Sequence, residues 1–242
     1  MAIGQQSRYM SRTGAGAQEL DVGLRNYMLK VYNYMALGVA FTGALGMLVA
    51  TSPALLQLSV SMHFVWFLAI LGLGWFAPRL MMTKSVATAQ AVFWIYAAMW
   101  GMALGPMLAL YAQMDPMLVA RAFMITAATF AGMSLLGYTT KKNLAPMGAF
   151  LAMATIGILI ALLVNVFFIE SSGFQLLLSI AVVLIFSGLT AYETQVIKTM
   201  YYETDGGDIV ARKAIFGAFM LYGSFVTLFV YILSILGIMR SE

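Results

Sequence analysis

The sequence contains no cysteine and a single histidine, His63. Disulfides, thiol nucleophiles and cysteine-ligated metals are therefore excluded, and one histidine supplies neither a zinc cluster nor a histidine relay. Walker A and dinucleotide-binding signatures are also absent. We accordingly expect no metal, no cofactor and no enzymatic activity.

Charged residues are scarce. They make up 9% of the 242 residues, whereas a typical soluble domain carries about 25%. Hydrophobic residues account for 62%, and the mean hydropathy is +0.92. The chain is therefore expected to be an integral protein of the lipid bilayer. Its pI is about 9.3, but the 13 Lys and Arg residues are scattered between apolar runs, so they do not predict nucleic-acid binding.

Apolar runs long enough to cross about 30 Å of hydrocarbon recur along the chain, separated by short polar breaks. The sequence predicts an all-α polytopic membrane protein with a polar cytoplasmic N-terminal tail at 1–26 and a seven-helix transmembrane domain at 27–238. The tail has few large apolar residues, so by itself we expect it to be irregular. The predicted spans lie near 27–50, 61–81, 86–111, 119–140, 146–169, 174–197 and 212–238.

Basic residues alternate across these spans. With the N-terminus in the cytoplasm, eleven lie inside and two, Arg121 and Arg240, lie outside. This bias predicts a cytoplasmic N-terminus and a periplasmic C-terminus. The length and the lack of cysteine favour a bacterial inner (plasma) membrane. The eleven are Arg8, Arg12, Arg25, Lys30, Arg79, Lys84, Lys141, Lys142, Lys198, Arg212 and Lys213.

Glu193 is the acidic residue that lies within an apolar run. A carboxylate at the centre of a bilayer costs about 2.5–3.5 kcal/mol on insertion scales, so its position calls for a reason. One interpretation is a proton-sensitive ion pathway. The alternative is a carboxylate at the membrane interface that pairs with Lys198 or Arg79. Arg79 ends the second span on the same side, where it is either a partner for Glu193 or an exposed anchor.

Hydroxyl side chains form a stripe on each of the last two spans. Helical spacing places the members of each stripe on one face, so the two stripes are expected to line a polar seam through the bundle. The alternative is that these hydroxyls serve helix packing and bond to their own backbone. The stripes consist of Ser187, Thr190, Glu193 and Thr194, and of Ser224, Thr227, Tyr231 and Ser234.

Small residues recur on two other spans. Gly101 and Gly105 form a GxxxG pattern on the third span, while Gly38, Thr42 and Gly46 form a stripe on the first. Such patterns indicate close packing of helices within a membrane.

Two segments carry a resemblance to a known family. Residues 188–197, GLTAYETQVI, resemble the sixth-helix signature of the Bax inhibitor-1 family, in which a Tyr-Asp-Thr-Gln core is usual and Glu193 takes the Asp position. Residues 221–229, LYGSFVTLF, resemble its seventh-helix pattern, Leu-Tyr-x-Asp-Phe-x-x-Leu-Phe. The resemblance extends from about residue 20 to the end of the chain.

This resemblance implies six helices around a central seventh. It also implies a pH-sensitive calcium leak, in which acids on the sixth and seventh helices share a proton and an arginine of the second helix latches them. The matching positions here are Glu193, Ser224 and Arg79. Ser224 departs from the pattern, because a serine cannot share a proton between like charges. Either Glu193 gates alone or the gating has been lost.

Two functions remain open from the sequence. The first is a pH-sensitive leak for calcium or another cation, whose pathway or gate comprises Glu193, Arg79, Ser224, Thr190, Thr194 and Thr227. The second is a membrane interaction protein that regulates a partner, such as a membrane-bound protease, through its N-terminal tail and without ion transport.

Overall fold

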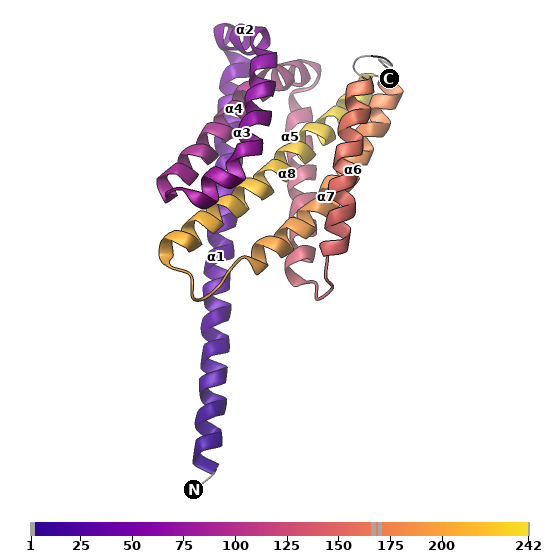
Figure 1. Cartoon of the computed structure of the whole chain (residues 1–242). Coiled ribbons are helices and arrows are strands. Elements are labelled where there is room, and N and C mark those ends of the chain that lie inside the picture. Colours follow the sequence, from indigo (N-terminus) through magenta and orange to yellow (C-terminus); the bar gives the residue numbers. More distant parts are fainter. Residues whose placement is uncertain (1–2, 166–167, 169–170, 242) are drawn as a thin grey trace.

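The structure is a computed structural model that describes residues 3–165, 168 and 171–241, and every regular element in these ranges is a helix (Figure 1). Seven of the helices are long and apolar enough to cross a membrane. The helices are α1 (Ile3–Thr51), α2 (Pro53–Ser61), α3 (His63–Thr83), α4 (Val86–Met114), α5 (Pro116–Thr139), α6 (Ala145–Val164), α7 (Ser172–Thr199) and α8 (Gly207–Ser241).

The seven predicted spans correspond to α1 and α3–α8, so the predicted fold class and number of spans are confirmed. The ends differ from the predicted ones by five residues at most. Residues 166–167 and 169–170, which the prediction placed at the end of the fifth span, lie outside the described residues. Long apolar runs predicted the spans well because insertion into hydrocarbon depends mainly on local composition.

The sequence prediction missed α2. This short helix follows the break at Ser52, and Pro53 occupies its first turn, where a missing backbone N–H costs nothing. Ser59 is buried on it and donates a hydrogen bond to the carbonyl oxygen of Met102 on α4, at 2.6 Å. At nine residues, α2 is too short to cross a bilayer, so it packs at the end of the bundle.

The expectation of an irregular N-terminal tail was wrong for the described backbone. Helix α1 already begins at Ile3 and projects beyond the bundle as one continuous rod (Figure 1). The transmembrane part from Val22 provides a formed helix, and propagating it adds one hydrogen bond for each residue fixed. The rod emerges at the same end of the bundle as the α5–α6 and α7–α8 loops.

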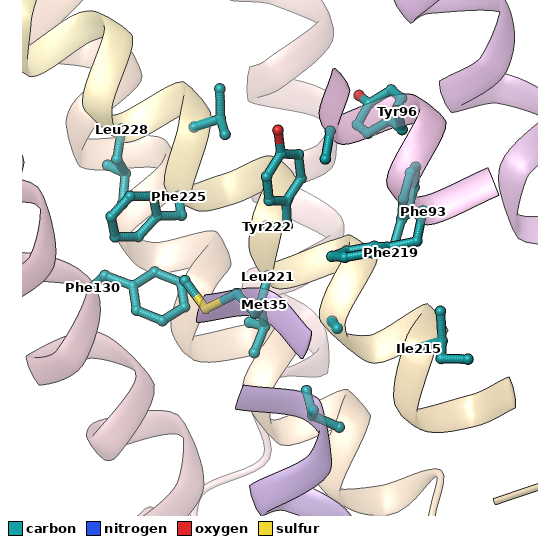
Figure 2. Close-up of a cluster of buried hydrophobic side chains, with 14 of the residues drawn as sticks. Met35, Phe93, Tyr96, Phe130, Ile215, Phe219, Leu221, Tyr222, Phe225 and Leu228 are labelled. Carbon is teal, nitrogen blue, oxygen red and sulfur yellow. The ribbon is translucent and has the colours of Figure 1, made fainter. Parts of the chain in front are cut away.

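Helix α8 is the centre of the bundle, as the resemblance implied. Within its apolar membrane-spanning segment 56% of the residues are buried, more than in any other span. Figure 1 shows α8 crossing diagonally between the other helices. Aromatic rings fix it in place (Figure 2): the Phe219 centroid lies 4.7 Å from that of Tyr96 on α4, and the Phe225 centroid lies 5.5 Å from that of Phe130 on α5. Such ring pairs contribute about 0.5–1.5 kcal/mol beyond burial of their area.

The two small-residue patterns face each other, which confirms their interpretation as packing sites. A methyl group placed on Gly101 of α4 would lie 2.9 Å from Cβ of Leu45 on α1, and one on Gly105 would lie 2.5 Å from Cβ of Val49. One placed on Gly46 would lie 3.4 Å from the carbonyl oxygen of Gly101. The missing side chains therefore allow α1 and α4 to approach closely.

Candidate functional site

Glu193 lies on α7, six residues before the helix ends at Thr199, which is about 9 Å along the axis. Its carboxylate is partly buried against α8. Ser224 Oγ donates a hydrogen bond to Glu193 Oε2 at 2.6 Å, and Ser224 itself is 2% exposed. The residue that departs from the family pattern is thus the one in contact with the intramembrane carboxylate.

The residues on either side of Glu193 contact two other helices. Ala191 lies against Gly137 of α5, so closely that a methyl group on that glycine would lie 2.8 Å from the Ala191 carbonyl carbon. The ring of Tyr192 fills the space over Gly148 of α6, where an added methyl group would lie 2.6 Å from ring carbon Cδ2. The backbone that carries Glu193 is therefore held by α5 and α6 while its side chain reaches α8.

A chain of hydroxyl groups adjoins Glu193. Thr194 and Ser134 of α5 are hydrogen-bonded at 3.0 Å between their side-chain oxygens, and Ser134 is bonded in turn to the Tyr32 hydroxyl of α1 at 2.7 Å. Thr194 also donates to the carbonyl oxygen of Thr190. Sequence reasoning missed Ser134 and Tyr32 because each is one of several hydroxyl residues on its span and stands out by no pattern. Only the packing of α1, α5 and α7 brings them together.

Gln195 joins α7 to the loop between α5 and α6. Its Oε1 accepts a hydrogen bond from the backbone N–H of Leu144 at 2.8 Å, and its Nε2 donates to the carbonyl oxygen of Lys142 at 2.9 Å. The amide side chain thus satisfies one donor and one acceptor of a loop whose backbone would otherwise depend on water.

Three other hydroxyls of the two stripes bond to their own helices. Ser187 donates to the carbonyl oxygen of Val183, Thr190 to that of Phe186, and Thr227 to that of Gly223. This is the packing behaviour that the sequence left as the alternative. The two stripes are therefore joined by the hydrogen bond between Ser224 and Glu193.

The two cations considered as partners of Glu193 lie elsewhere. Arg79 is exposed on α3, a helix that packs chiefly against α4, and α8 crosses between α3 and α7 (Figure 1). Lys198 donates to the carbonyl oxygen of Tyr138 at 2.9 Å, and its Nζ lies 4.9 Å from the centroid of that ring. Among the side chains that the structure describes, Glu193 has no basic nitrogen within 4.0 Å.

The loop between α7 and α8 is tied down by basic residues of α8. Arg212 Nη1 donates to the carbonyl oxygens of Met82 and Lys84, at 2.7 and 3.0 Å, and thereby caps the end of α3. Lys213 Nζ lies 2.5 Å from Asp205 Oδ2 and also donates to the carbonyl oxygen of Met200. These contacts hold the α7–α8 loop against the start of α8, and the start of α8 against the end of α3.

A cavity of about 400 Å³ opens at the other end of the α7–α8 seam. Its polar lining comes from Tyr111 of α4, Gln175 of α7, and Tyr231 and Ser234 of α8. Tyr231 lies seven residues beyond Ser224, which is about 10 Å along α8. Tyr231 and Ser234 of the predicted α8 stripe therefore line a vestibule, while Ser224 at the other end of the stripe contacts Glu193.

No group of three or more His, Cys, Asp or Glu side chains able to hold a metal ion occurs in the part of the chain that the structure describes. An ion near Glu193 would therefore meet one carboxylate together with hydroxyl and carbonyl oxygens. Calcium prefers six to eight oxygen ligands, so this arrangement suits transient passage better than tight binding.

Comparison with known proteins gives a consistent result. A family model described as inhibitor of apoptosis-promoting Bax1 matches residues 24–241. An uncharacterized protein of Rickettsia prowazekii is 38% identical over 219 residues, covering 90% of this chain and 91% of the relative. A Caulobacter vibrioides protein is 38% identical over 231 residues, covering 90% of each. The inner membrane protein YbhL of Escherichia coli is 34% identical over 220 residues, covering 89% of this chain and 92% of the relative.

Proposed function

The chain belongs to the Bax inhibitor-1 family, and from this premise we propose that it is a pH-sensitive leak for calcium or another cation, gated by Glu193. It is a multi-pass membrane protein, and its relative YbhL is an inner membrane protein. We place it in the bacterial inner membrane with the N-terminus in the cytoplasm, because eleven of its 13 basic residues then face that side.

The hydrogen bond between Ser224 and Glu193 is the observation that carries this proposal. It joins a titratable side chain within one span to the central helix of the bundle. Ionised groups inside membrane proteins commonly mark ion pathways, because only a functional advantage offsets their cost. The vestibule lined by Tyr231 and Ser234 supplies the outer end of a pathway along the same seam.

The gate follows from the chemistry of this contact. A hydroxyl bonded to an ionised carboxylate makes a charge-assisted hydrogen bond, roughly twice as strong as one between neutral groups. Ionised Glu193 therefore holds α7 against α8, and protonation weakens the contact. The described groups beside Glu193 are uncharged hydroxyls: α8 contributes Ser224, and the neighbouring α5 hydroxyl, Ser134, bonds to Thr194. The leak should rise as the pH falls.

Calcium flux into liposomes that hold the purified protein, measured from about pH 5 to about pH 8, tests this proposal. The variants are Glu193→Gln, which keeps the shape but cannot ionise, and Ser224→Ala, which removes the donor. Glu203→Gln is the matched control, because Glu203 is exposed in the α7–α8 loop.

A pH-dependent flux that is flattened in Glu193→Gln and kept in Glu203→Gln supports the single-carboxylate gate. Flux with the same pH profile in Glu193→Gln would place the gate elsewhere. Flux no greater than that of empty liposomes at any pH would mean that the serine at position 224 marks a member without transport.

A second function is favoured by one observation, the projection of α1 beyond the bundle (Figure 1). A rod that extends from the membrane offers a contact for a partner, such as a membrane-bound protease. Deletion of residues 1–20 separates the two functions. It should leave flux unchanged if the bundle is a leak, and it should abolish regulation of the partner if the rod is the contact.

A further inference from the structure

A second membrane-facing cavity lies between α1 and α5. Its volume is about 630 Å³, and it extends from Arg25 and Tyr138 at one end to Phe225 of α8 in the centre of the bundle. Most of its wall is apolar, with Met28, Met35 and Phe130 among the lining residues. The hydrogen-bonded Tyr32 and Ser134 form a polar point in this wall.

The cavity opens toward the lipid. Leu29 and Leu135 line it from α1 and α5 and are 48% and 63% exposed, although both lie within the membrane spans. In a bilayer these surfaces face hydrocarbon rather than water. An apolar cavity that opens sideways in this way is accessible to molecules already dissolved in the membrane.

One basic residue lines the mouth of the cavity, and a second lies beside it. Arg25 lines it directly, and Lys198 lies over the Tyr138 ring, 4.9 Å from its centroid. Neither has a carboxylate oxygen within 4.0 Å among the described side chains. At the opposite end of the bundle, by contrast, Arg121 and Arg240 both pair with Asp115. The mouth of the α1–α5 cavity therefore combines positive charge with an apolar interior.

The volume of the α1–α5 cavity indicates whether its occupant is a lipid acyl chain or a helix of a partner protein. A helix about 10–12 Å in diameter, with a rise of 1.5 Å per residue, fills roughly 120–170 Å³ for each residue. The cavity volume of about 630 Å³ then corresponds to only about four or five helical residues. A membrane span needs about 20, so a partner helix does not fit inside.

We propose that the α1–α5 cavity binds an acyl chain of an anionic phospholipid whose phosphate contacts Arg25. The lipid belongs to the leaflet on the side of the α5–α6 loop, because Tyr138 lies one residue before α5 ends at Thr139 and Arg25 lies three residues into the α1 span that begins at Val22. The planar guanidinium of Arg25 suits a phosphate group, and the apolar wall suits the chain. This inference does not depend on ion transport.

Native mass spectrometry of the full chain tests the proposal, with equal amounts of dioleoyl phosphatidylglycerol and dioleoyl phosphatidylcholine added in detergent. One basic residue at an anionic surface favours the anionic lipid by about fivefold, so Arg25→Ala should reduce the phosphatidylglycerol preference by about that factor. Ala131→Phe fills the cavity and should remove the bound lipid of both kinds. Lys84→Ala is the charge control in the α3–α4 loop, and Ala128→Phe is the bulk control at an exposed position of α5.

The outcomes separate clearly. A preference that falls in Arg25→Ala but persists in Lys84→Ala and Ala128→Phe supports the site. Equal lipid retention by the wild type, Arg25→Ala and Ala131→Phe would overturn it. If Ala131→Phe fails to fold, Ala36→Phe fills the same cavity from α1 and gives the same readout. The binding measurement stands apart from flux, so the lipid site can fail while the leak persists, or the reverse.

Discussion

Substitution of Gly137 by alanine should separate α5 from α7 beside Glu193. A methyl group at this position would lie 2.8 Å from the carbonyl carbon of Ala191, and it would lie nearer still to the carbonyl oxygen. Ordinary van der Waals contact begins at 3.4 Å, so the two helices must move apart by at least about 0.6 Å. Backbone atoms cannot rotate away as a flexible side chain could.

The expected cost is set by overpacking, which amounts to about 1–3 kcal/mol in a well-packed interior. It is opposed by the higher helix propensity of alanine, which contributes about 0.5–1 kcal/mol. Gly132 on the same helix provides the control, because a methyl group there meets no atom within 4 Å. The propensity gain is common to both variants, so the difference between them isolates the clash.

Thermal unfolding of the purified protein in detergent gives the comparison. With about 2–4 °C for each kcal/mol in a chain of this size, Gly137→Ala should unfold roughly 2–12 °C below Gly132→Ala. Movement of α7 should also lengthen the Ser134–Thr194 contact, now 3.0 Å, and increase hydrogen exchange near Glu193. Equal midpoints for the two variants would refute the close approach of α5 and α7 on which the site depends.

Three further predictions concern the loops. Gln195→Ala removes two hydrogen bonds to the α5–α6 loop and should increase tryptic cleavage there at least severalfold, since each bond contributes about 0.5–1.5 kcal/mol. Gln113→Ala should leave this cleavage unchanged. Equal cleavage in the two variants would show that the Gln195 hydrogen bonds do not hold the loop. The pKa of Asp115 is held below its usual 3.8, chiefly by the hydrogen bond from the Met117 N–H and then by Arg240 and Arg121. The ionised carboxylate therefore stabilises the fold above pH 3.8, and this stabilisation is lost as the pH falls through the lowered pKa. Asp115→Asn should flatten this acid dependence of the unfolding midpoint. Because the chain lacks cysteine, single cysteines at Lys84 and Gln113 should be labelled from opposite sides by an impermeant maleimide, and labelling from one side would refute the proposed orientation.

The membrane topology was readable from the sequence because it depends on local properties. A run such as 86–111 inserts as a helix according to its own hydrophobicity, and the observed helix begins at the same residue, Val86. The prominence of Glu193 was likewise local, since it requires only a carboxylate within an apolar run. The glycine pairs of α1 and α4 were recognisable because small residues at helical spacing have one principal use in membranes.

The partners of each side chain were decided by the tertiary structure. Lys198 is five residues from Glu193 in sequence, yet it turns to the carbonyl oxygen of Tyr138 because α5 lies on that face of α7. The hydrogen bond between Ser134 and Tyr32 joins residues 102 positions apart, and the hydrogen bond between Gln195 and Leu144 joins residues 51 positions apart. No local pattern encodes such a pairing, since it depends on which faces of the helices meet.

The sequence by itself determined that this chain crosses a membrane seven times and carries one unusual carboxylate. Both follow from the cost of transferring individual side chains into hydrocarbon, which is a property of each segment alone. The tertiary structure decided that Ser224 meets that carboxylate, that Arg79 does not, and that a largely apolar cavity lies between α1 and α5. Those contacts depend on how the described helices pack against one another, and packing is a property of the whole chain.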